Sequence, residues 1–183
     1  MIYAIISILV IRNSMFMFHK DYLYNKEDVM DDIVRLSLED LDDFLESLMI
    51  YFPDDNIKRE DWIELLEDER TFVYAIKENE VIKANIAIYN WKGENNYIKI
   101  MTIGTHPEHR NRGYAHILMQ YVIDEMLKDD MHIFKGETRK SNFKMQKVFE
   151  DFGYKIISKV EKYYDNPIET AYKYSLEMQE RVI

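Results

Sequence analysis

The spacing of apolar and polar residues predicts an alternation of strands and helices over most of the chain. Short apolar or alternating segments favour strands at 33–37, 71–77, 81–91, 97–105 and 131–136. Apolar positions at helical spacing favour an acidic helix that starts near Ser37 and ends before Pro53, and a second helix at 59–67. A long amphipathic helix is expected after Gly113, and a shorter helix ending at Gly153 is expected before two final strands.

This order predicts one α/β domain of the α+β type. A mixed, largely antiparallel central sheet is expected, flanked by helices. Its early strands would be antiparallel, and a parallel crossover would surround the helix that follows Gly113.

The N-terminal residues form a separate apolar segment, MIYAIISILVI. It is shorter than the ~20 residues that span a bilayer, and no basic region precedes it as in a signal peptide. We predict an extension at 1–27, in which Ile2–Ile11 and Met15–Tyr24 pair as a hairpin, and a main domain at 28–183. The alternative is an arm that contacts a partner, such as a second copy of the chain in a homodimer.

Composition narrows the function classes. The 183 residues, 47% of them hydrophobic, suffice for one globular domain with a core. The absence of cysteine excludes disulfides, thiolate metal sites and an acyl-cysteine intermediate, and it fits a cytoplasmic protein. A net charge of −10 argues against nonspecific binding to nucleic acid or anionic membranes. It favours a cationic or amine-bearing partner, although solvation explains the acidity equally well.

The segment 97–115 joins an apolar strand to the long helix through the turn Arg110, Asn111, Arg112, Gly113, Tyr114, Ala115. The first N–H groups of a helix lack partners inside the helix and carry the positive end of its dipole, so they can receive phosphate oxygens. Gly113 lets the backbone bend, and Ala115 leaves room for a phosphate against the main chain. The turn is typical of a pyrophosphate site, and an ordinary strand-to-helix turn is the alternative.

A second block follows the next predicted strand. It reads Glu137-Thr-Arg-Lys-Ser-Asn142 and leads into the short helix that ends at Gly153. In this order and spacing, the two blocks resemble the GNAT superfamily of acyl-CoA-dependent N-acyltransferases, over roughly residues 31–175. The resemblance implies a GNAT-like fold and acetyl-CoA as co-substrate.

The resemblance also implies a set of contacts with acetyl-CoA. Residues Arg110 to Ala115 would form the pyrophosphate loop, and Asn142 with the helix that follows it would flank the pantetheine arm. GNAT folds splay their fourth and fifth strands, and the pantetheine pairs with the fourth as an added strand would. Ile103 and Thr105 are the expected partners, with ordinary sheet pairing as the alternative. Backbone N–H groups near Ile103 and Gly104 would polarise the thioester carbonyl.

An amine acceptor arrives mostly as an ammonium, so a base must remove a proton before attack. Glu137 is the expected base, because it lies five residues before Asn142, where the branch resembling ribosomal-protein alanine N-acetyltransferases carries its catalytic glutamate. Partial burial at a strand end would raise its pKa. The alternative is a surface glutamate paired with Arg139 or Lys135.

Two positions depart from the family pattern. The histone-acetylating branch carries its base eleven residues before the turn, where this chain has Lys99. Many members carry a tyrosine seven residues after Asn142 as general acid for the leaving thiolate, and this chain has Phe149, which would border the cofactor without donating a proton. An unperturbed thiol pKa of about 8.5 lets coenzyme A leave as a thiolate near neutral pH.

The other polar and aromatic residues near the two blocks are weaker candidates. Lys140, Lys144 and Lys147 are candidates for contact with the 3′-phosphate of the cofactor, with a solvated basic face as the favoured alternative. Tyr154, Tyr163 and Tyr164 are interpreted as packing residues. His106 and His109 bracket a Pro-Glu pair, but their spacing fits no established zinc pattern, so we expect no metal.

The expected function is therefore transfer of an acetyl group from acetyl-CoA to a primary amine of a small molecule or of a peptide or protein N-terminus, by direct attack. A non-catalytic acyl-CoA-binding regulatory module is the first alternative, motivated by Phe149 and Lys99. An interaction protein whose N-terminal extension drives assembly is the second.

Overall fold

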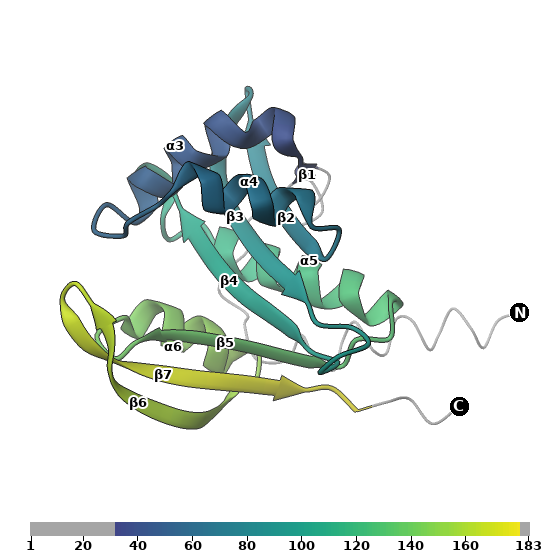
Figure 1. Ribbon diagram of the computed structural model, residues 1–183, viewed down its shortest axis with the longest axis vertical. Coiled ribbons are helices and arrows are strands. Elements are labelled where there is room, and N and C mark those ends of the chain that lie inside the picture. The colour runs from purple at the N-terminus through teal and green to yellow at the C-terminus, as the bar shows by residue number, and fades with distance from the viewer. Residues whose placement is uncertain (1–31, 180–183) are drawn as a thin grey trace, which may run out of the picture.

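A computed structural model describes residues 32–179 of the chain as a seven-stranded mixed sheet with helices on both faces (Figure 1). The predicted extension at 1–27 lies outside the described residues. The elements, in chain order, are β1 (Ile33–Leu36), the 3-10 turn η2 (Leu38–Asp40), α3 (Leu41–Tyr51), α4 (Arg59–Glu67), β2 (Thr71–Glu78), β3 (Val81–Asn90), β4 (Ile98–Thr105), the 3-10 turn η3 (Pro107–His109), α5 (Tyr114–Lys128), β5 (Ile133–Arg139), α6 (Phe143–Asp151), β6 (Lys155–Asp165) and β7 (Ile168–Glu177).

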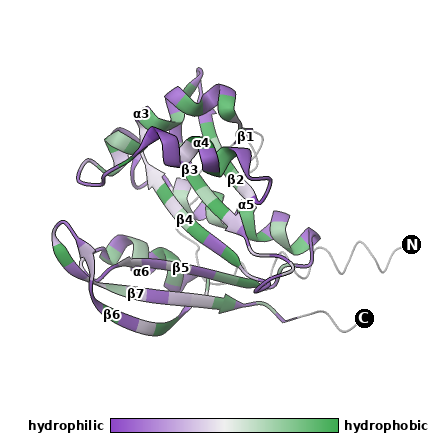
Figure 2. Cartoon of the chain, in the orientation of Figure 1, coloured by the Kyte–Doolittle hydropathy of each residue, from purple (hydrophilic) through white to green (hydrophobic). Residues whose placement is uncertain are grey.

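The helices cover the two faces of the sheet and divide the core in two. Phe44 and Leu48 of α3 are buried with strand residues on one face, and Trp62 of α4 packs against the same cluster. On the other face, α5 and α6 share a larger cluster that includes Leu118 and Phe149. Hydrophobic colour recurs along the central strands, and hydrophilic and hydrophobic residues alternate along α3 and α4 (Figure 2). This division matches the amphipathic patterns in the sequence.

The sheet order is β1-β2-β3-β4-β5-β7-β6, and every neighbouring pair is antiparallel except β4 and β5. The connection between these two parallel strands contains α5, as the predicted crossover requires. The expected mixed, largely antiparallel sheet is therefore confirmed.

Strands β4 and β5 separate after a short contact, which is visible in Figure 1. They pair only at Ile98 with Phe134 and at Lys99 with Lys135. Beyond that point β4 continues to Thr105 along β3, and β5 follows β7 instead. The edge of β4 that faces β5 therefore lacks a strand partner over most of its length within residues 32–179.

One boundary differs from the prediction in a way that affects the site. Strand β5 starts at Ile133, later than predicted, and runs through Arg139. Glu137 consequently lies within the strand and pairs with Lys173 of β7, instead of sitting at a strand end. Among residues 32–179, no helix is long and apolar enough to cross a membrane.

Candidate active site

A cavity of about 610 Å³ opens where β4 leaves β5. Its walls come from the end of α3, the last residues of β4, the turn into α5 and the first half of α6. Nine of the residues expected to contact the cofactor line it: Ile103, Gly104, Thr105, Arg110, Asn111, Gly113, Tyr114, Ala115 and Asn142. The structure therefore brings the two sequence blocks together around one space.

The N-terminus of α5 forms one wall of this cavity. Gly113 precedes the helix with φ of +80°, a left-handed conformation that glycine adopts without a Cβ penalty. No side chain caps the helix at Gly113, so the first N–H groups of α5 remain available to a ligand. Arg110 and Arg112 are exposed next to them, although Arg112 does not line the cavity. This wall suits an anion.

Tyr51 also lines the cavity, and it was not identified from the sequence. It is the last residue of α3, and its hydroxyl donates a hydrogen bond to the carbonyl oxygen of Ile82 at 3.1 Å. Its ring lies so close to β4 that a Cβ built on Gly104 would come within 2.3 Å of it. Gly104 therefore allows α3 to close over the end of β4, a contact that no local pattern in the sequence indicates.

Helix α6 contributes another wall. Asn142 caps it, because the side-chain oxygen accepts the N–H of Met145 at 3.1 Å. Phe143, the first residue of the helix, lines the cavity although 75% of it is exposed. Lys144 and Lys147, considered in the sequence for phosphate contact, also line it. At the far end, Asp151 is bound by Lys147 and by His116, whose Nε2 is 3.0 Å from the carboxylate.

Phe149 does not line this cavity. Its side chain is only 1% exposed and stacks on Tyr174, with 4.8 Å between ring centroids. The far edge of the ring is directed at Gly136, where an added Cβ would come within 2.6 Å of it. Phe149 thus belongs to the core behind the separation of the two strands.

Glu137 lies at the same separation, outside the lining of the cavity, and both of its carboxylate oxygens have partners. Oε2 accepts a hydrogen bond from the ammonium of Lys99, and Oε1 accepts one from the hydroxyl of Tyr163 at 2.9 Å. The expected alternative partners are engaged elsewhere. The ammonium of Lys135 lies over the ring of Tyr97, and Arg139 binds the turn between β6 and β7.

These contacts shift the pKa of Glu137 in the direction opposite to the one expected from the sequence. Burial raises the pKa of the carboxyl group, but the hydrogen bond and charge of Lys99, the hydrogen bond from Tyr163 and the charge of Lys173 together outweigh it. The net effect lowers the pKa below its ordinary value, so the carboxylate stays ionised at neutral pH. Tyr163, interpreted from the sequence as a packing residue, is therefore a partner of the candidate base.

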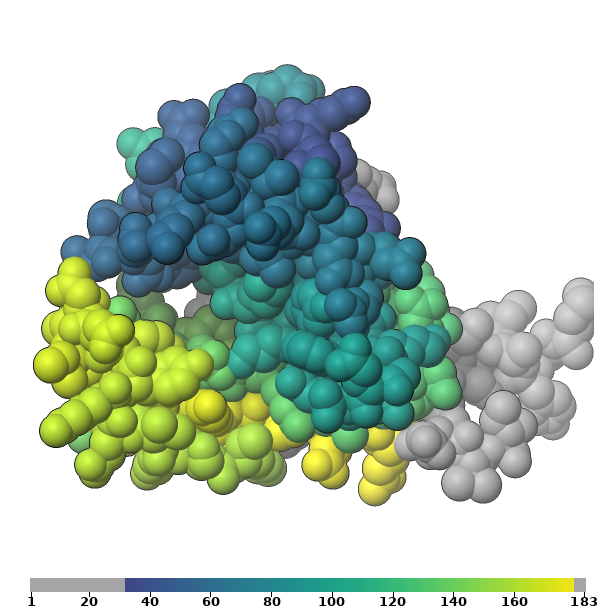
Figure 3. All heavy atoms as spheres, in the orientation of Figure 1, coloured from purple at the N-terminus to yellow at the C-terminus, as the bar shows by residue number. Residues whose placement is uncertain are grey.

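The surface is hollowed between the α3–α4 segment and the β6–β7 hairpin (Figure 3). Arg139 connects the two sides. Its guanidinium donates to the carbonyl oxygens of Asn166 and Pro167 at 3.0 and 3.1 Å, and lies 3.7 Å from Asp55 in the α3–α4 loop. It also lies over the ring of Tyr164. The hairpin that supplies Tyr163 is thereby held against the rest of the domain.

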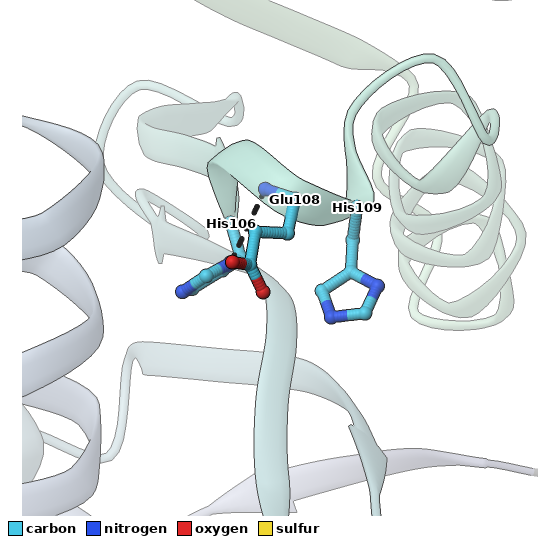
Figure 4. A group of neighbouring side chains, drawn as sticks. All are labelled: His106, Glu108 and His109. Atoms are coloured by element: carbon cyan, nitrogen blue, oxygen red, sulfur yellow. Dashed lines mark hydrogen bonds between the residues drawn. The ribbon is translucent and has the colours of Figure 1, made fainter.

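Three potential metal ligands meet in the turn after β4 (Figure 4). His106, Glu108 and His109 each place one such atom within 4.8 Å of the others. However, Nδ1 of His106 already accepts the N–H of Glu108. Burial lowers the pKa of His109, as do the nearby charges of Lys83 and Arg112, which would also repel a metal ion. One ring nitrogen of His106 thus serves as the N-cap of η3.

Comparison with known proteins agrees with this geometry. The family model described as "Acetyltransferase (GNAT) family" matches residues 33–154, which is more than half of the chain. No curated protein matches the sequence.

Solved structures reproduce the fold at low sequence identity. The ribosomal-protein-S18-alanine N-acetyltransferase from Escherichia coli aligns with a TM-score of 0.73 and 18% identity, over 81% of this chain and 94% of that one. The structure of yncA from Salmonella typhimurium, with its cofactor acetyl-CoA, aligns with a TM-score of 0.67 and 13% identity, over 82% of this chain and 95% of that one. IAA acetyltransferase from Bacillus cereus aligns with a TM-score of 0.66 and 13% identity, over 80% of this chain and 98% of that one.

These likenesses show the fold, and the family match covers the strands and helices that build the cavity. The chain belongs to the GNAT family of acetyltransferases.

Proposed function

We propose that this protein transfers an acetyl group from acetyl-CoA to a primary amine of a small molecule or of a peptide or protein N-terminus, by direct attack. The observation that carries the proposal is a continuous cavity that extends from the uncapped N-terminus of α5 to the unpaired edge of β4. An elongated molecule with a phosphate-rich part and an amide-bearing arm fits both ends of such a space.

The residues around the cavity suit each part of acetyl-CoA. The N–H groups after Gly113, with Arg110 and Arg112 close by, would bind the pyrophosphate. The backbone of Ile103 and Thr105 would pair with the pantetheine amides as an added strand does. Because Phe149 is buried in the core and does not line the cavity, we propose that it packs behind the pantetheine arm without contacting it.

Glu137 is proposed as the base. The nitrogen of the acceptor attacks the carbonyl carbon of the thioester, the new C–N bond forms, and the C–S bond breaks with its electron pair on sulfur. Glu137 receives the proton lost by the amine, directly or through one water. N–H groups near Ile103 and Gly104 would stabilise the negative charge that develops on the carbonyl oxygen. The thiol pKa of about 8.5 makes a protonated leaving group unnecessary.

The acceptor is proposed to enter through the hollow between the α3–α4 segment and the β6–β7 hairpin (Figure 3). Strand β6, which belongs to that hairpin, supplies Tyr163, whose hydroxyl donates a hydrogen bond to Glu137. Helices α3 and α4 carry acidic residues in their first turns, which would attract an amine that is protonated in solution. The name of the Escherichia coli relative specifies an alanine of a ribosomal protein. Peptides that begin with alanine therefore belong among the acceptors tested.

The test is release of free thiol from acetyl-CoA with a panel of amines, including small diamines and alanine-ended peptides. We expect thiol release that depends on both acetyl-CoA and at least one amine. Tight binding of acetyl-CoA without thiol release for any amine would favour the alternative, a regulatory module that retains the acyl-CoA. Phe149 in place of a tyrosine is the observation behind that alternative.

Glu137→Gln tests the role of the base, because it keeps the shape and hydrogen bonding of the side chain but removes its basicity. The transfer rate near neutral pH should fall by about 10²–10⁴-fold, with the affinity for acetyl-CoA nearly unchanged. Higher pH should recover part of the loss, since more of the amine is then neutral. Glu161→Gln, at an exposed position of β6, is the control and should retain the rate. Wild-type rates for Glu137→Gln across about pH 6 to 9 would place the base elsewhere.

A further inference from the structure

We infer that Lys99 is a positioning residue for Glu137: its ammonium, together with the hydroxyl of Tyr163, holds the carboxylate oriented where β4 and β5 separate. The inference rests on the proposed function, in which Glu137 accepts the proton of the amine. The histone-acetylating branch of the family carries its base at this position, and the family pattern implies no role for a lysine there.

The location of Lys99 supports this role. Lys99 is the last residue of β4 that pairs with β5, and its neighbour in that pairing is Lys135. Its side chain reaches past this pair to Glu137, two residues further along β5. The ion pair therefore links the two strands at the point where they begin to diverge, next to the unpaired edge of β4.

The contact is also better shielded than an ordinary surface ion pair. The side chain of Lys99 is 26% exposed and that of Glu137 is 21% exposed. Lower exposure strengthens the attraction between the charges and reduces screening by salt. Fully exposed pairs, by contrast, contribute little.

The two hydrogen bonds leave Glu137 able to accept a proton. An ionised carboxylate offers about four lone pairs on its two oxygens. The Lys99 ammonium and the Tyr163 hydroxyl each use one, on different oxygens. The carboxylate is thus fixed from two sides while lone pairs remain for the amine or for a bridging water.

The neighbouring strands also place Lys173 and Tyr164 near Glu137. Lys173 of β7 is its partner in the sheet register, and its ammonium lies 4.9 Å from the centre of the Tyr163 ring. Burial raises the pKa of Tyr164 to about 12, helped by the charge of Glu137, so this phenol stays neutral. Of the cations, Lys99 makes the direct contact and has the largest effect on the pKa of Glu137.

Removing the charge of Lys99 leaves the effect of burial less opposed. The pKa of Glu137 then rises, and the carboxylate is protonated at a higher pH. The base is lost as the pH falls through that new value, so the acid limb of the rate profile moves to higher pH. A lysine whose ammonium made no contact with Glu137 would not produce this change.

The experiment is a titration of the Glu137 side-chain carboxyl by carbon NMR in the full chain, with the signal assigned by its loss in Glu137→Gln. In Lys99→Met the midpoint should move up by about 1–3 pH units. It should move little in Lys99→Arg, which keeps the positive charge. Lys135→Met is the matched control, because it removes a lysine from the paired position without contact to Glu137, and its midpoint should stay near the wild-type value.

The second measurement is the pH dependence of kcat with one competent amine. In Lys99→Met, the acid limb of the kcat profile should move to higher pH together with the titration midpoint of Glu137. In Lys99→Arg, the acid limb should lie near its wild-type position. An unchanged midpoint in folded Lys99→Met overturns the inference, whatever the activity. A midpoint that moves without the acid limb would preserve the coupling and overturn Glu137 as the base. If Lys99→Met does not fold, Lys99→Gln decides, because it also removes the charge: an upward movement of the midpoint supports the inference, and an unchanged midpoint contradicts it.

Discussion

Gly104 is a residue whose identity is set by a neighbour distant in sequence. The ring of Tyr51 leaves no room for a Cβ, because the nearest ring atom would lie 2.3 Å away. Gly104→Ala should therefore lower the free energy of unfolding by about 1–3 kcal/mol, as overpacked sites do. Denaturant unfolding measures the effect. The same substitution in a Tyr51→Ala background should cost clearly less, and an equal cost in both backgrounds would show that the two residues do not compete for space.

Phe149 is the residue whose environment changes the prediction most. Its ring is buried between Tyr154 and Tyr174 and is directed at Gly136. Phe149→Tyr adds a hydroxyl to this closely packed region and should destabilise the fold by about 1–3 kcal/mol without raising turnover. Thermal unfolding and thiol release measure the two effects. A variant that is as stable as the wild type and turns over faster would place the ring beside the leaving sulfur.

At the residue scale, the sequence indicated Glu137 but not its surroundings. Lys99 is 38 positions earlier, and their contact depends on the parallel register between β4 and β5. Neighbours in sequence suggested Lys135 or Arg139 as partners, yet the strand directs each of them to another contact. The expected rise in pKa was wrong for the same reason, because burial could be anticipated and Lys99 could not.

At the scale of elements, Asn142 belongs to α6 as its N-cap. Asn142→Ala should lower the free energy of unfolding by about 1 kcal/mol, whereas Asn142→Ser keeps a capping oxygen and should lose much less. Chemical denaturation distinguishes the two variants. If Asn142→Ala is as stable as the wild type but binds acetyl-CoA more weakly, the side chain serves the cofactor and not the helix.

Most elements were predictable because local chemistry marks their ends. Ser37 and Asp40 form a capping box ahead of α3, and Gly113 and Gly153 have positive φ where α5 begins and α6 has ended. The start of β5 was placed too early because Met131 is apolar and buried without belonging to the strand. Apolar character alone does not distinguish a buried approach to a strand from the strand itself.

At the scale of the whole molecule, the sheet order and the separation of β4 from β5 create the cavity. The family resemblance implied this separation, whereas the periodicity of the strands did not, since it is the same for paired and unpaired edges. The participation of α3 in the wall, through Tyr51, also depends on tertiary packing. The sequence thus contains the motifs of the site, but the shape of the cavity depends on how segments distant in the sequence pack together.

The most direct test of the account is whether acetyl-CoA binds at the N-terminus of α5. Acetyl-CoA at ~100 times its dissociation constant should stabilise the folded protein by about 2.7 kcal/mol and raise its melting temperature. Gly113→Glu should abolish that rise, because its side chain and charge would occupy the phosphate site. Gly93→Glu is the matched control, since Gly93 also has a positive φ, +84°, with no neighbouring atom within 4 Å of an added Cβ. The melting temperature should rise fully in the control and not at all in folded Gly113→Glu, and an equal rise in both variants would place acetyl-CoA elsewhere.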